Sequence, residues 1–288
     1  MISKGTLTIE NFAFGYTSEG EGPDALVIGS SLYYPRSFSS NLRKHLRLHF
    51  VDYRGFAKPL NPNEDRVPSF DRLIDDIEII RKKLSLKKCL VIGHSAHALL
   101  ALSYAKKYPQ HVSHVVMIAT SPSLIPTYMA MADEHFKESV WPERKEALAQ
   151  KSEAFSDEKL LALPPNKRFI QWNINRAPLS WYNFNYDPSP LWEGVLPNMA
   201  ILDFLYKVAL KDLDIAKGLE SFSIPVFLAL GRFDYIMPPP KSWDSLRSKF
   251  KNLTVRIFER SAHSPQQEEP SLFDSELLDW LNFSKHSF

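Results

Sequence analysis

The sequence has one cysteine, Cys89, among its 288 residues. A lone thiol excludes an intramolecular disulfide and a zinc site built from several thiolates. It is also typical of a protein kept in a reducing compartment, so we expect a cytoplasmic location. Cys89 stands in the apolar run KKCLVIG, where we expect a buried strand residue rather than a reactive thiol.

The sequence also lacks an excess of charge and any long apolar run. Its 35 basic residues balance 33 acidic residues, and this absence of a basic stripe makes nucleic acid an unexpected partner. No run approaches the roughly 20 apolar residues of a membrane span, and MISKGTLTIE has no signal-peptide pattern. With 44% hydrophobic residues, the chain is expected to fold around a substantial core, and nothing here indicates an oligomeric state.

Short apolar runs rich in β-branched residues alternate with segments of helical spacing. The predicted strands are 25–29, 46–54, 89–93, 114–120, 225–231 and 253–258, and the predicted helices are 69–84, 98–108, 240–250 and 271–283. This alternation predicts a parallel sheet with helices on both faces. Segment 6–20 alternates in the manner of antiparallel strands that lead into the sheet.

The strand rhythm stops between about residues 121 and 211. This segment has nine of the prolines, one glycine and four of the six tryptophans, so it is interpreted as an insertion. Part of it is helical in pattern, whereas 176–194 is an aromatic loop of the kind that shapes pockets.

The stretch VIGHSAHALL, residues 91–100, places a serine between a predicted strand and a predicted helix. A tight turn of this kind exposes the serine hydroxyl, and the helix N-terminus directs N–H groups at an anion formed beside it. Ser95 is therefore the candidate nucleophile and the Ala96 N–H a candidate oxyanion donor. A serine before a helix is also a common N-cap, so this stretch is a weak signal when taken alone.

Two later loops supply possible partners for Ser95. Asp234 follows the strand PVFLALG, and His263 follows the strand LTVRIF, each just beyond the carboxyl end of its strand. The chain order serine, acid, histidine is the one used with a strand-turn-helix nucleophile. We expect Ser95, Asp234 and His263 to form a catalytic triad.

These motifs resemble those of the α/β-hydrolase superfamily over nearly the whole chain. DYRGFAKP (52–59) resembles the family's D-x-R-G-x-G-x-S loop, with Ala57 in place of the second glycine, and HSPQQEEP resembles the tail after its catalytic histidine. The resemblance implies a mostly parallel eight-stranded sheet with helices on both faces. It also implies a core of residues 1–120 and 212–288 and a mainly helical cap, 121–211, inserted after the sixth strand. The cap sequence is most similar to the proline-iminopeptidase-like branch.

The chain departs from the family pattern at two places near the site. His97 stands where the turn's last glycine is usual, and it is either packed beside the cap or in contact with substrate. SSLYYP (30–35) replaces H-G-x-P, and the alignment makes the Leu32 N–H the second oxyanion donor and puts Tyr33 at the pocket mouth. His94 is interpreted as a turn residue beside the nucleophile.

The predicted function is cleavage of a small ester or amide through an acyl-enzyme on Ser95, with no metal or organic cofactor. The candidate pocket residues are Tyr33, His94, His97, Trp181, Trp192 and Glu193. If the peptidase resemblance is functional, Glu193 or Asp187 would recognise a free amine. Trp141, Trp172, Tyr182, Phe184 and Tyr186 belong either to this pocket or to the cap core. A small-molecule receptor, a lyase and a C–C bond hydrolase are alternatives that use the same site.

Overall fold

The computed structural model describes residues 2–61 and 67–285. In these residues eight strands form one sheet in the order β1-β2-β4-β3-β6-β7-β8-β9, and the two-residue β5 (Lys58–Pro59) pairs with β2. The eight are β1 (Ser3–Ile9), β2 (Phe12–Glu19), β3 (Asp24–Gly29), β4 (Arg47–Asp52), β6 (Cys89–His94), β7 (Val112–Ile118), β8 (Val226–Gly231) and β9 (Leu253–Phe258). The pairs β1–β2 and β2–β4 are antiparallel, and all pairs from β4 to β9 are parallel. The predicted mostly parallel sheet is confirmed.

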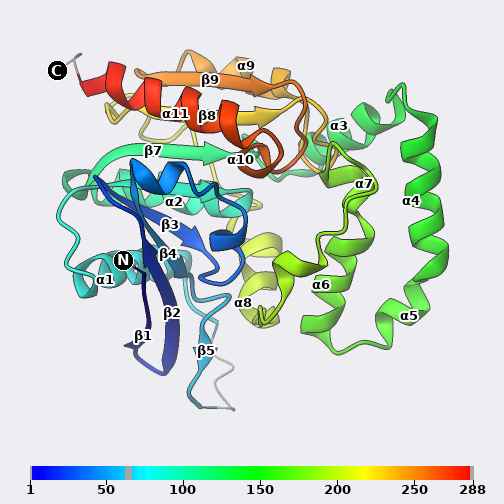
Figure 1. Cartoon of the computed structure of the whole chain (residues 1–288), viewed down its shortest axis with the longest axis horizontal. Coiled ribbons are helices and arrows are strands. Elements are labelled where there is room, and N and C mark those ends of the chain that lie inside the picture. The colour runs from blue at the N-terminus through cyan, green and yellow to red at the C-terminus, as the bar shows by residue number, and fades with distance from the viewer. Residues whose placement is uncertain (1, 62–66, 286–288) are drawn as a thin grey trace.

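Helices cover both faces of this sheet, because successive strand residues point to opposite sides. On β3, Leu26 and Ile28 belong to the core shared with α1 (Phe70–Lys83) and α2 (Ala96–Lys107). Ala25 and Val27 belong instead to the core shared with α11 (Pro270–Lys285), on the opposite face in Figure 1. Two cores therefore hold one sheet between helical layers.

The structure has a shorter helix in the region of residues 240–250 than the sequence predicts. The chain forms a 3₁₀ turn, Pro240–Trp243, and the four-residue α9 (Asp244–Arg247). Trp243 is buried and its Nε1 donates to the Thr120 carbonyl oxygen at 3.0 Å. Because this anchor draws the chain into the core and Phe250 is buried again just after α9, a continuous helix is not formed.

A helical insertion follows β7, the sixth of the eight long strands. It contains α3 (Pro126–Lys137), α4 (Pro142–Ala154), α5 (Asp157–Leu161), α6 (Pro165–Asn175), α7 (Ala177–Ser180), α8 (Met199–Phe204) and a π-helical turn (Leu205–Ala209). Proline opens α3, α4 and α6, where its fixed φ favours the first helical position. Figure 1 shows α3 to α7 beside the end of the sheet toward which the arrows of β3, β7 and β8 point. The insertion therefore faces the carboxyl ends of the parallel strands.

Two buried charges fix the loop after β4 at this end of the sheet. The carboxylate of Asp52 accepts hydrogen bonds from the N–H groups of Ser31, at 2.7 Å, and Gly15, at 2.8 Å. The Arg54 guanidinium donates two hydrogen bonds to the Asp76 carboxylate on α1, at 2.6 and 2.8 Å. Burial raises the pKa of Asp52 to about 6 despite these hydrogen bonds. Through its bond to Ser31, Asp52 at the end of β4 also holds the loop that follows β3 in place.

Candidate active site

Ser95 lies in a strained turn between β6 and α2. Its φ of 57° and ψ of −131° are unusual for a residue with a side chain, which costs roughly 1–3 kcal/mol. A Cβ on Gly93 would lie 2.2 Å from the His97 carbonyl oxygen and 2.6 Å from the Ala98 Cα, so only glycine allows strand and helix to come this close. The Ser95 N–H donates to the Ile118 oxygen of β7 at 2.8 Å. The turn is thus fixed by its neighbours.

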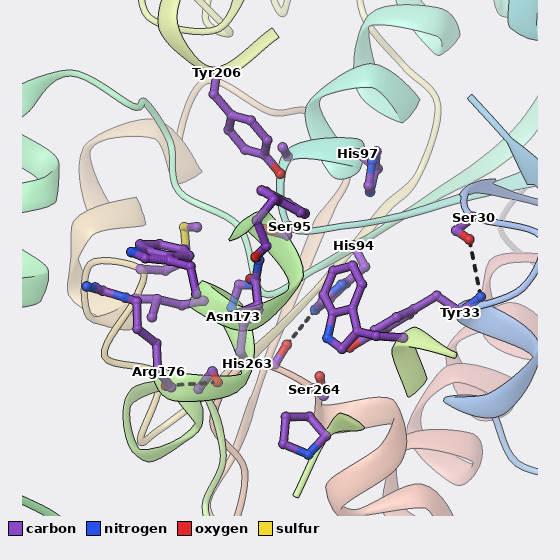
Figure 2. Close-up of a pocket in the computed structure, with 18 of the residues that line it drawn as sticks. Ser30, Tyr33, His94, Ser95, His97, Asn173, Arg176, Tyr206, His263 and Ser264 are labelled. Carbon is purple, nitrogen blue, oxygen red and sulfur yellow. Dashed lines mark hydrogen bonds between the residues drawn. The ribbon is translucent and has the colours of Figure 1, made fainter. Parts of the chain in front are cut away.

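Asp234 and His263 meet beyond the ends of β8 and β9. His263 Nδ1 lies 2.7 Å from Asp234 Oδ2, and both side chains are buried. The other carboxylate oxygen of Asp234 accepts the N–H groups of Ile236, at 3.0 Å, and Met237, at 3.2 Å. With Nδ1–H donating to the carboxylate, His263 Nε2 is left to accept a proton. Ser95 and His263 line the same pocket (Figure 2).

A second carboxylate supports the loop that carries His263. Glu268 in α10 (Pro265–Glu268) accepts the N–H groups of Ala262, at 2.9 Å, and Ser264, at 3.1 Å, which flank the histidine. It also accepts the N–H of Tyr182 in the helical insertion, at 2.5 Å. Burial raises the pKa of Glu268 to about 7 although these N–H groups favour the ionised form. We did not single out Glu268 as a site residue from the sequence, although it lies in the motif HSPQQEEP.

Residues 179 and 180 of the insertion are bonded to the loops that carry Asp234 and His263. The His263 N–H donates to the Ser180 oxygen at 3.0 Å, and the Tyr235 N–H donates to the Leu179 oxygen at 2.9 Å. Arg144 of α4 is fully buried and donates to the carbonyl oxygens of Pro178, Trp181 and Tyr182 at 2.6–2.7 Å. Residues 177–182 are therefore held from both sides. No sequence pattern indicated this use of Arg144.

Tyr34 connects the two histidines of the Ser95 turn. Its hydroxyl lies 3.2 Å from His94 Nδ1 and 3.0 Å from His97 Nδ1. His94 Nε2 lies 2.6 Å from the main-chain oxygen of His263. Burial lowers the pKa of His97 to about 4, and burial together with His263 lowers that of His94 well below its ordinary value. Both rings are therefore neutral at pH 7.

The pocket has a volume of about 760 Å³ and is lined by residues from the ends of the strands and from the helical insertion. Of the predicted pocket residues, Tyr33, His94, His97, Trp181 and Trp192 line it, as do Ser95, Ala96 and His263. Tyr33 packs edge-on against Trp192 at 4.8 Å between ring centroids. Of the five further aromatic candidates, Trp172 also lines the pocket. Trp141 instead stacks on Phe233 of the loop after β8, at 4.6 Å between ring centroids.

Three predicted positions fall outside the pocket lining. Leu32 is 44% exposed, and its N–H is directed at the Ser30 hydroxyl, at 3.3 Å, as is that of Tyr33, at 3.2 Å. The loop turns here so that Tyr33 and Tyr34 face inward and Leu32 faces outward. Glu193 is exposed, and Arg36 holds its main-chain oxygen at 2.8 Å. Asp187 is also exposed and bonds to Ser189. Neither acid is placed to meet an amine in this pocket.

The charges that do line the pocket are mainly positive. They are Arg168, Arg176, Lys207 and Asp203, and Asp203 is paired with Lys207 at 3.0 Å. The Arg176 guanidinium lies 4.5 Å from the centroid of Trp172. Among the described residues, no carboxylate lies within ion-pair distance of Arg176. An anion in this pocket would therefore meet a cation that makes no direct ion pair, although Asp133 attracts it from a longer distance.

Residues 2–61 and 67–285 contain neither a metal-binding cluster nor a membrane-spanning helix. No group of three His, Cys, Asp or Glu side chains in this part of the chain is arranged to hold a metal ion. No helix in it has the length and apolar character needed to cross a bilayer.

Residues 27–270 match the family model described as alpha/beta hydrolase fold. The chain belongs to this family, in agreement with the geometry of its sheet and nucleophile turn.

Relatives cover nearly the whole chain. The AB hydrolase superfamily protein YclE of Bacillus subtilis is 35% identical over 273 residues, 95% of this chain and 96% of that protein. Proline iminopeptidase PfmaB of Pestalotiopsis fici is 24% identical, over 81% and 80% of the two chains. A pimeloyl-[acyl-carrier protein] methyl ester esterase of Aliivibrio fischeri is 24% identical, over 93% and 96%. The solved structure of an alpha/beta fold family hydrolase from Bacillus anthracis has a TM-score of 0.68 at 22% identity and covers 97% and 99%, which shows a shared fold.

Proposed function

We propose that the protein is a serine hydrolase that cleaves a small ester through an acyl-enzyme formed on Ser95. The observation that carries this proposal is the 2.7 Å hydrogen bond between Asp234 and His263, together with the presence of His263 and Ser95 in the lining of one pocket. Ser95 Oγ attacks the carbonyl carbon while His263 Nε2 takes its proton. Asp234 holds the ring and stabilises the imidazolium.

The rest of the reaction uses the same groups. Ala96, at the first position of α2, lines the pocket, and its N–H is the proposed donor to the oxyanion. The tetrahedral intermediate collapses, the leaving group takes the proton from His263, and the alcohol departs. Water then attacks the acyl-enzyme with His263 as base, which releases the acid and restores the Ser95 hydroxyl. We further propose that residues 121–211 form the cap over this chemistry. The cytoplasmic location stays a prediction.

The pocket charges favour an ester with an anionic group over an aminoacyl substrate. A free amine requires a carboxylate partner, but Glu193 and Asp187 lie outside the pocket lining, and Asp203, which lines the pocket, is already paired with Lys207. Arg176 instead offers a guanidinium in the wall that forms no ion pair with a carboxylate of the described residues. A hydrogen bond to a charged group contributes about 1.5–3 kcal/mol, which is roughly tenfold or more in affinity. The relatives include both an iminopeptidase and a methyl ester esterase, so the substrate test below has to separate them.

The first experiment tests the nucleophile. Wild-type protein should hydrolyse p-nitrophenyl esters and be labelled by a fluorophosphonate probe, and Ser95→Ala should abolish both. Ser180→Ala is the matched control, because Ser180 lines the same pocket but its hydroxyl bonds to main-chain oxygens of α7 and its flank, at 3.3 and 3.5 Å. Labelling that persists in Ser95→Ala would refute the proposal. Turnover near background together with tight ligand binding would favour a receptor.

The second experiment tests the substrate class. A p-nitrophenyl monoester of a dicarboxylic acid is compared with the alkanoate ester of equal length and with a prolyl p-nitroanilide. We expect the anionic ester to have the highest kcat/KM and Arg176→Gln to lower its advantage roughly tenfold. Preference for the prolyl anilide would overturn the ester assignment in favour of an aminopeptidase.

A further inference from the structure

The oxyanion proposed at Ser95 needs a second donor besides the Ala96 N–H. Serine hydrolases stabilise the tetrahedral intermediate with more than one hydrogen bond, and the loss of one donor typically lowers kcat about 10²- to 10³-fold. The sequence predicts the Leu32 N–H for this purpose. In the structure Leu32 is 44% exposed and lies outside the pocket lining, so it does not supply the second donor.

The main chain of residues 31–34 has no N–H group left to give. The Ser31 N–H donates to the Asp52 carboxylate at 2.7 Å. The N–H groups of the next three residues point at the hydroxyl or the main-chain oxygen of Ser30, at 3.2–3.3 Å. Because these bonds hold the loop in its turn, we expect the second donor to be a side chain.

Tyr206 of the insertion carries a hydroxyl without a partner. The residue lies in the π-helical turn after α8, is half-buried and lines the pocket. No residue in the described parts of the chain makes a hydrogen bond with this hydroxyl, and its oxygen keeps accessible surface, unlike the enclosed hydroxyl of Tyr53. A phenol that is open to the pocket and unpartnered is able to donate to a ligand.

The Tyr206 hydroxyl is directed at the turn that carries Ser95. Figure 2 shows the ring running from the insertion toward Ser95 and ending in the hydroxyl. Burial and, after it, the charge of an ionised Tyr206 raise the pKa of Tyr53, so the hydroxyls of these two residues lie near each other. The Tyr53 ring packs against His97 in the first turn of α2, at 4.8 Å between ring centroids. The Tyr206 hydroxyl is therefore near the helix end that supplies the Ala96 N–H.

The segment that carries Tyr206 is anchored to the core of the sheet. Leu205 and Leu210, on either side of Tyr206, are fully buried in the core shared with α1 and α2, and the Leu210 N–H donates to the Leu205 oxygen at 2.9 Å. The Asn198 N–H, at the start of α8, donates to the Gly55 oxygen at 2.8 Å. Turns of the π type are frequent at functional sites, and this one holds its tyrosine in a fixed position.

The hydroxyls of the loop after β3 are placed less favourably. That of Tyr34 is already bonded to both histidines of the Ser95 turn, at 3.2 and 3.0 Å. Ser30 lies beyond these histidines as seen from Ser95 in Figure 2. The Tyr33 ring packs against a tryptophan of the insertion, at 4.8 Å between ring centroids.

We propose that the Tyr206 hydroxyl is the second donor to the oxyanion, so that a residue of the insertion completes the hole that Ala96 begins. As Ser95 Oγ bonds to the carbonyl carbon, the π electrons of the carbonyl move to its oxygen, and the phenol donates a hydrogen bond to that oxygen while keeping its proton. Burial raises the pKa of Tyr206 to about 12, which keeps the phenol protonated at neutral pH. This inference rests on the proposed function, because the oxyanion forms only if an ester reacts at Ser95.

The first test removes the phenol oxygen. Tyr206→Phe should lower kcat for a p-nitrophenyl ester about 10²-fold and leave KM within about twofold, because the donor acts on the intermediate. The melting temperature should not fall, since the lost hydroxyl has no partner. Tyr186→Phe is the matched control: Tyr186 lies in the insertion outside the pocket lining, its hydroxyl is bonded to Gln267 at 3.0 Å, and kcat should stay within about twofold. A folded Tyr206→Phe variant with wild-type kcat would overturn the inference.

The second test separates contact with the carbonyl oxygen from a structural role. The p-nitrophenyl ester is compared with its thiono analogue, in which sulfur, a weak hydrogen-bond acceptor, replaces the carbonyl oxygen. The ratio of kcat/KM for the oxygen ester to that for the sulfur ester should be at least about tenfold smaller in Tyr206→Phe than in wild type, because the variant lacks a donor that distinguishes the two. An unchanged ratio in Tyr206→Phe, or a decrease found in Tyr33→Phe in its place, would overturn this inference alone. Failure of the wild-type protein to cleave any ester would instead refute the proposed function and this inference with it.

Discussion

The hydrogen bonds of Asp234 determine what an asparagine at this position would do. In Asp234→Asn the amide oxygen has to stay with the N–H groups of Ile236 and Met237, because an NH₂ group there would face two donors. The NH₂ group is then directed at His263 Nδ1, 2.7 Å away in the parent protein. His263 Nδ1 has to become the acceptor.

The proton of His263 consequently moves to Nε2, the atom proposed to take the proton of Ser95. Loss of the correct tautomer lowers turnover about 10⁴-fold in a serine protease, which corresponds to about 5.5 kcal/mol. We expect kcat/KM for a p-nitrophenyl ester to fall about 10³- to 10⁴-fold at pH 7. Because the replacement is isosteric, the melting temperature and KM should change little.

Asp244→Asn is the matched control for this experiment. Asp244 lies on the same β8–β9 connection, is 67% exposed and meets Arg247 at a distance of 3.7 Å. Its replacement should leave kcat/KM within about twofold, because exposed pairs contribute less than about 1 kcal/mol. A folded Asp234→Asn variant that keeps more than a tenth of wild-type activity would refute both the tautomer argument and the proposed role of Asp234.

Three further predictions concern stability and reactivity. Asp76→Asn leaves buried Arg54 without its main partner and should lower the free energy of unfolding, measured in urea, by about 3–5 kcal/mol. Asp71→Asn is the control: this residue lies on the same helix, is 81% exposed, and its replacement should lower the free energy of unfolding by about 0.5 kcal/mol or less. Equal losses in the two variants would contradict the buried-pair argument. The pKa of Glu268 is raised from 4.5 to about 7, so folding favours the protonated form of this carboxyl group. The free energy of unfolding should therefore fall as the pH rises from about 4.5 to about 7, by at most about 3 kcal/mol. Glu268→Gln should flatten the stability profile between these pH values, and an unchanged slope would show that the carboxyl does not titrate there. Burial raises the pKa of the Cys89 thiol to about 12, so iodoacetamide at pH 8 should modify it only after unfolding, and rapid reaction of the native protein would contradict its burial.

The part of the site that could be predicted from sequence is the part fixed by strand ends. Ser95, Asp234 and His263 each follow an apolar run, and parallel strands bring their carboxyl ends to one edge of the sheet. In the structure Ser95 and His263 line one pocket and Asp234 forms a hydrogen bond with His263, and the catalytic roles of the three residues stay predictions.

The remaining features depend on contacts between segments that are distant in sequence. Whether Leu32 or Tyr33 faces inward is decided by the Ser30 hydroxyl and by Asp52 on the neighbouring strand. The carbonyl oxygens that hold Arg144 come from residues 34 to 38 positions later in the chain. Hydrophobic periodicity carries no information on either arrangement, because both follow from tertiary packing rather than from the local pattern.

The main-chain bonds at Leu179 and Ser180 have a consequence for redesign of the protein. Since the acid loop and the histidine loop each donate an N–H to this short helix, a chimaera that replaces it would remove the supports of both loops at once. A replacement for the rest of the insertion should therefore keep residues 177–182 together with Arg144 of α4, which holds them from the other side. This leaves α3, α5 and α6 exchangeable. Substrate range could then be altered by such exchange while the reacting groups keep their alignment.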